Sequence, residues 1–167
     1  MSHHRSLNKT GWLLPLALLL AHPPTASAQV PELDPYSVVY VCTGTGLLQA
    51  VSREVPPRLL AQVEHQLGGF GSCDMDPLRD RGVIYARMWH GQLMTTHAFD
   101  AATLQRRPEL DIPGPPFRDG AVAVDPWRRL LYVSAPFSLF AYSLDPATHG
   151  QQVALLEDPD LSPPEPP

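Results

Sequence analysis

The chain has 167 residues, of which 44% are hydrophobic and 17% are charged, and its formal net charge is −5. This hydrophobic content is typical of a globular protein and excludes a wholly disordered chain. The length fits one domain, and the acidic balance gives no electrostatic basis for binding nucleic acid.

Residues 1–28 have the three parts of a secretory signal peptide. A basic start is followed by an apolar run at 11–21, and the small residues Ala26 and Ala28 precede a cleavage point before Gln29. The apolar run is shorter than the roughly 20 residues that cross a bilayer. We therefore predict a secreted or periplasmic protein with no integral membrane span after signal removal. An uncleaved membrane anchor is the alternative, against which two prolines in this segment argue.

The rest of the chain contains an internal repeat. The segment 71–77 (GSCDMDP) matches 120–126 (GAVAVDP) at its glycine and at its Asp-Pro, and a further Asp-Pro stands at 34–35. A β-rich run centred on a tyrosine follows each Asp-Pro. The offsets of 42 and 49 residues are typical of propeller blades. We predict three units, at 34–67, 71–113 and 120–157.

Each unit reads as short strands in sequence. The predicted strands are 37–42, 47–52 and 58–64 in the first unit, which lacks an inner strand; 71–75, 83–88, 92–99 and 104–112 in the second; and 120–124, 130–135, 138–144 and 151–157 in the third. Residues 59–67 also have the apolar spacing of a short amphipathic helix, but their place in the repeat favours a strand. Residues 158–167 form a proline-rich tail that we expect to be disordered.

The segments 121–134 (AVAVDPWRRLLYVS) and 140–148 (FAYSLDPAT) resemble the lactonase-like or YVTN-type β-propeller repeat. In that family the motif is a folding signature, and proteins of very different activity share it. The resemblance implies an all-β fold, a partial propeller of about three four-stranded antiparallel blades, the first without its inner strand. The motif residues are Asp76, Pro77, Tyr85 and Asp100 in the second unit, and Asp125, Pro126, Tyr132 and Asp145 in the third.

Three blades do not close a ring, because propellers typically use roughly four to eight. Self-association of two copies, a partner chain, or blades lost from the C-terminus would complete it. A truncated propeller that remains a marginal fragment is the other alternative.

The two cysteines, Cys42 and Cys73, form an even count in an exported chain, which favours a disulfide. The repeat places them in adjacent blades, so that a bond would tie one blade to the next. Two buried free thiols are the alternative.

Asp74 and Asp76 are two residues apart on the predicted inner strand of the second unit, where side chains line a propeller's channel. Carboxylate oxygens bind hard cations, so Asp74 is a candidate Ca²⁺ ligand. The third unit has Ala123 in its place, so the fold does not require Asp74. Asp76 is expected to be a turn residue, like Asp125.

The remaining polar motifs predict no site. The histidines outside the signal segment lack the spacing of metal ligands and are expected to be solvated or packed; they are His65, His90, His97 and His149. The basic pairs 106–107 and 128–129 are expected to be solvated ion-pair partners.

The sequence contains no Gly-x-Ser-x-Gly elbow, phosphate-cradling loop or dinucleotide fingerprint. We therefore expect a binding or scaffold module without chemistry of its own. The alternative is an enzyme that resembles lactonase-type or quinone-dependent propellers, with a site that includes Asp74 and is completed by missing blades or a second subunit. A third possibility is a degenerate, non-functional gene product.

Overall fold

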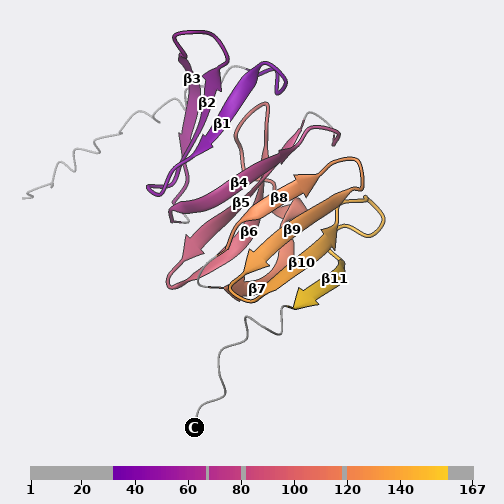
Figure 1. The fold of residues 1–167 in the computed structure, drawn as a ribbon. Helices are drawn as coiled ribbons and strands as arrows, with labels where there is room; N and C mark the ends of the chain where they lie inside the picture. The colour runs from indigo at the N-terminus through magenta and orange to yellow at the C-terminus, as the bar shows by residue number, and fades with distance from the viewer. Residues whose placement is uncertain (1–31, 67, 80–81, 118–119, 158–167) are drawn as a thin grey trace, which may run out of the picture.

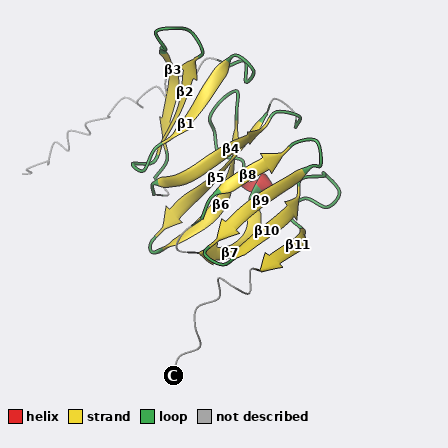
Figure 2. Cartoon of the chain, in the orientation of Figure 1, coloured by secondary structure: helices red, strands yellow, loops and turns green. Residues whose placement is uncertain are grey.

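The computed structural model describes residues 32–66, 68–79, 82–117 and 120–157. Within these ranges the chain forms eleven strands and one short 3₁₀ helix (Figures 1 and 2). The predicted signal peptide, 1–28, and the predicted tail, 158–167, lie outside the described residues.

The strands form three antiparallel sheets, and each strand pairs with the next one in the sequence. The first sheet contains β1 (Val38–Cys42), β2 (Leu47–Ser52) and β3 (Leu59–Glu64); the second contains β4 (Phe70–Asp76), β5 (Val83–His90), β6 (Leu93–Asp100) and β7 (Ile112–Phe117); the third contains β8 (Val122–Asp125), β9 (Leu130–Ala135), β10 (Ser138–Ser143) and β11 (Gln152–Glu157).

The three sheets are successive blades of a partial β-propeller. Figure 1 shows the second sheet between the first and the third. The strands β4 and β8, each the first of a four-stranded sheet, contact one another, and β1 contacts β4. In the described part of the chain the first sheet has three strands and no counterpart of β4 or β8. The predicted fold class is therefore confirmed, including the blade without its inner strand.

The hydrophobic core has two parts, one on each face of the second sheet. Ile84 and Met88 of β5 pack in the cluster shared with the first sheet, whereas Val83 and Tyr85 pack in the cluster shared with the third. A sheet covered on both faces buries consecutive residues of its central strand. In β5, the six residues from Val83 to Met88 are all buried.

The outer strand of the second blade lies later in the chain than predicted. Residues 104–112 were expected to form it, but Leu104 has a φ of 60° and the 3₁₀ helix Pro108–Leu110 follows. The strand β7 begins at Ile112 and includes three prolines. An edge strand tolerates proline, because one of its sides needs no N–H donors.

The segment at 59–67, which the sequence left open between strand and helix, contains the strand β3 at Leu59–Glu64. It pairs with β2 along its length, as the repeat position predicted.

Candidate functional site

Within residues 32–157, as far as the structure describes them, no strand pairs with the inner edge of β1. Thr43 donates its N–H to Leu47 O, next to the paired strands β1 and β2. Because hydrogen bonding alternates along an antiparallel pair, the backbone groups of Val38, Tyr40 and Cys42 point to the opposite edge. One of them is covered, since Arg53 Nε donates to Val38 O at 3.3 Å.

A hollow of about 210 Å³ follows this edge, between β1 and β4. Tyr40 and Arg53 line it from the first blade, and Asp74 and Met75 line it from β4. The hollow combines apolar walls with one cationic and one acidic side chain.

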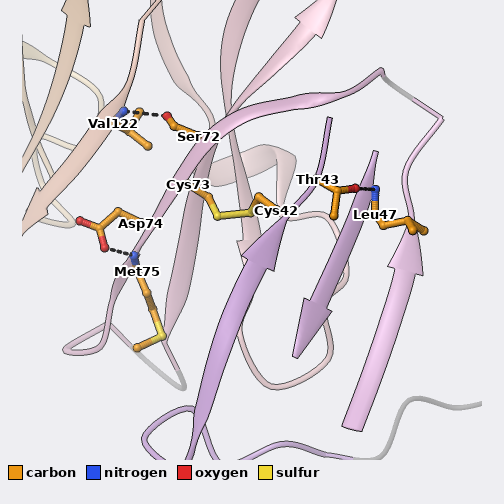
Figure 3. Close-up of a disulfide and its surroundings, with 8 residues drawn as sticks. All are labelled: Cys42, Thr43, Leu47, Ser72, Cys73, Asp74, Met75 and Val122. Carbon is orange, nitrogen blue, oxygen red and sulfur yellow. Dashed lines mark hydrogen bonds between the residues drawn. A yellow bond between two sulfur atoms is a disulfide. The ribbon is translucent and has the colours of Figure 1, made fainter. Parts of the chain in front are cut away.

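A disulfide between Cys42 and Cys73 joins β1 to β4 beside this hollow (Figure 3). The two Cα atoms are 6.2 Å apart and the cysteines are 31 residues apart in the sequence. The structure thus contains the predicted bond between adjacent blades, and it fixes the position of the open edge relative to β4.

Asp74 is exposed, and its carboxylate hydrogen-bonds to two backbone amides. Oδ1 accepts from Met75 N at 2.8 Å, and Oδ2 accepts from Val124 N at 2.7 Å. Ser72 Oγ accepts from Val122 N at 3.0 Å in the same way (Figure 3). Side chains of β4 therefore hydrogen-bond to the backbone of β8, since the two strands belong to different sheets and share no backbone ladder. In the described part of the chain no group of three or more His, Cys, Asp or Glu could hold a metal ion. The Ca²⁺ site at Asp74 stays a prediction.

Asp76 is fully buried and lies in a different environment from Asp74. Arg129 Nη1, from the third blade, donates to both carboxylate oxygens at 2.9 and 2.8 Å, and Leu78 N donates to Oδ1 at 3.1 Å. Arg129 Nη2 also donates to Leu144 O at 3.1 Å. Asp76 is thus both the predicted turn residue and one half of an ion pair between blades.

The neighbouring arginine behaves as the sequence predicts. Arg128 is largely exposed and pairs with Asp125 at 3.0 Å. Arg129 has only 21% of its side chain exposed, and its φ of 55° turns it toward the second blade. The prediction of a solvated pair at 128–129 is therefore confirmed for Arg128 and wrong for Arg129, which pairs with a buried carboxylate of the second blade.

His149 is a packed residue between the second and third blades. Its Nε2 donates to Leu110 O at 2.9 Å, so its Nδ1 accepts from Arg79 Nη1 at 2.9 Å. Burial lowers the pKa of His149, and the nearby arginines act in the same direction. The ring is therefore held neutral, with both nitrogens engaged.

His65 and His97 are also packed. The ring of His65 lies 4.6 Å from that of Phe99, and burial lowers its pKa. His97 contacts Asp111, which Arg106 also contacts. Burial opposes ionisation of Asp111, but hydrogen bonds from His97, Arg106 and Ala98 N hold its pKa below its usual value.

No protein-family model and no curated protein matches the chain. Among solved structures the chain is similar to one titled a functionally unknown protein from Desulfotomaculum acetoxidans DSM 771, with a TM-score of 0.51 and 16% sequence identity. The match covers 75% of this chain and 38% of that chain, so this chain spans well under half the length of its structural neighbour. Similarity at this level concerns the fold alone. Among the described residues, no helix has the length and apolar character needed to cross a membrane.

Proposed function

We propose that the chain is an exported, incomplete β-propeller of the lactonase-like or YVTN type that acts as a binding or scaffold module. The observation that carries this proposal is that the second blade covers only one face of each of its neighbours, so that the outer faces of the first and third blades stay uncovered within the chain. The disulfide is consistent with a secreted or periplasmic location, since such bonds persist in oxidising compartments.

The surface proposed for binding is the outer face of the first blade. Val39 and Val41 are 49% and 39% exposed there, while Val38, on the opposite face of the same strand, is buried in the core. At the other end of the molecule, Leu156 of β11 is 62% exposed. Within the chain, the second blade covers the facing sides of its two neighbours. The partner that fits these two exposed faces is therefore another blade, which would pack against each of them as the second blade packs against their inner sides.

A second copy of the chain supplies such a blade. Two copies would provide about six blades, which is within the range of closed propellers. In a two-fold arrangement the first blade of one copy would pack against the third blade of the other, and both open ends would be covered.

The test is the mass of the folded species, measured by light scattering on the purified chain. We expect a dimer, and we expect Val39→Glu to convert it to a monomer because the charge would be buried against the partner. Gln92→Glu, which adds the same charge at an exposed turn, is the matched control and should remain a dimer. A soluble wild-type monomer would contradict closure by a second copy.

The enzyme alternative makes a different prediction. If Asp74 binds Ca²⁺ in a catalytic site, Ca²⁺ should raise the melting temperature, and Asp74→Ala should abolish that rise. A protein that does not respond to Ca²⁺ favours the binding module.

A further inference from the structure

Arg87 is a fully buried arginine in the middle of β5, and it is the exception in a strand whose other buried residues are apolar or aromatic. Side chains alternate along a strand, so Arg87 shares the face of Val83 and Tyr85, which packs on the third blade. Its Nη1 donates to Thr96 Oγ1 on the paired strand β6 at 3.2 Å.

Among the residues that the structure describes, the other edge of this guanidinium has no hydrogen-bond partner. Nε and Nη2 are both buried and unbonded. These two nitrogens are adjacent, and their N–H groups are parallel, which is the arrangement that binds a carboxylate through two hydrogen bonds.

A third unbonded donor comes from the opposite blade. The hydroxyl of Tyr142, on β10, is buried and has no partner either. It lies against Gly114, where an added Cβ would stand only 2.7 Å from it. Tyr142 packs in the same core cluster as Val83 and Tyr85, whose face of β5 Arg87 shares. Burial lowers the pKa of Arg87 and raises that of Tyr142.

An arginine keeps its positive charge even when it is buried, because its pKa lies far above neutral pH. A buried cation is stable only when a counter-charge or a set of acceptors satisfies it. We propose that Arg87 Nε and Nη2, together with the hydroxyl of Tyr142, bind a small monovalent anion between the second and third blades. A carboxylate of the size of formate fits the parallel donors, and chloride fits the same charge and donors.

This site is internal, since Arg87 has no exposed surface and Tyr142 is 2% exposed. The anion would therefore be taken up as the two blades pack, and it would stabilise their interface rather than serve as a substrate. The inference does not depend on the proposed binding function, because it concerns an interface within one chain.

The experiment measures the melting temperature of the purified chain in sodium formate, in sodium chloride and in the sodium salt of a bulky sulfonate, at equal ionic strength. At a small-anion concentration ten times its Kd, we expect the melting temperature to rise by about 3–6 °C relative to the bulky salt. A rise in formate alone identifies a carboxylate site, and a rise in both small anions identifies a site for either.

Arg87→Met should abolish the difference between salts. Arg128→Met removes the same charge from the exposed surface and should respond like the wild type, which controls for general salt effects. If Arg87→Met does not fold, Tyr142→Phe tests the same site, and it should raise the anion concentration needed for half of the stabilisation several-fold.

A crystal structure with bromide gives a readout that does not depend on stability. We expect an anomalous peak within hydrogen-bond distance of Arg87 Nε and Nη2. Water or a carboxylate of the chain itself on that edge would overturn the proposal, as would equal melting temperatures in all three salts.

Discussion

Asp76 and Asp125 occupy the same position in successive repeats, yet the structure gives them different surroundings. Both accept a backbone hydrogen bond from the residue two positions later, as turn aspartates do. Asp76 is fully buried and paired with Arg129 of the next blade, whereas the partner of Asp125 is the exposed Arg128. The second blade has a neighbour on that side, and the repeat motif alone does not distinguish the two positions.

This difference predicts unequal costs for the same substitution. Asp76→Asn removes the buried charge partner of Arg129 and leaves it only the exposed Asp145, 3.9 Å away, so we expect the free energy of unfolding to fall by about 3 kcal/mol. Asp125→Asn removes an ion pair that water already screens, and we expect a clearly smaller loss. Urea unfolding of both variants provides the comparison, and equal losses would show that the pair across the blades adds nothing.

The sequence predicted the turn role of Asp76 because that role depends on neighbouring residues only. It did not predict the partner, since Asp76 and Arg129 are 53 residues apart. The sequence also did not predict that Arg87 is buried, because no local motif marks this residue. An arginine within an apolar strand has no motif, and only the packing of the third blade shows that its guanidinium has no access to water.

At the scale of strands, the residue pattern predicted the strand positions correctly where two neighbouring strands of a blade both carry it. The strand pairs β5–β6 and β9–β10 follow the predicted segments closely. The prediction was wrong at β7. The prolines of this segment argue against a strand, whereas the apolar residues Leu104 and Leu110 suggested one earlier in the chain. Both leucines are buried, but they belong to a turn and to a 3₁₀ helix that cover the end of the sheet.

The disulfide acts between elements, by tying β1 to β4. Removing it in a Cys42→Ala, Cys73→Ala double variant should lower the free energy of unfolding by about 3–4 kcal/mol, as chain entropy predicts for a loop of this length. Denaturant unfolding with and without a thiol reductant measures the change. The reductant should affect the wild type and leave the double variant unchanged; a wild type that does not respond would contradict this role.

For the whole molecule, the order of the blades predicts an uneven distribution of stability. The second blade is covered on both faces, the first has only three strands, and the side chains of β11 from Gln152 to Leu156 are exposed. In an arrangement of repeats, each unit is stabilised mainly by its nearest neighbours. The central blade therefore has two stabilising interfaces, and each terminal blade has one.

Native-state hydrogen exchange should reveal this order, because local opening exposes amides according to the stability of their own segment. In a monomeric form, such as the one expected for Val39→Glu, we expect the amides of β5 and β6 to exchange most slowly and those of β11 most quickly. Reduction of the disulfide should then accelerate exchange in β1, β2 and β3 while leaving β9 and β10 unchanged, because the bond holds only the first blade. Equal rates in all three blades, both before and after reduction, would mean that the blades unfold as one cooperative unit and that the ends are protected as well as the centre. In the proposed wild-type dimer a second copy would cover both ends, so the amides of β11 should exchange more slowly there than in the monomeric variant.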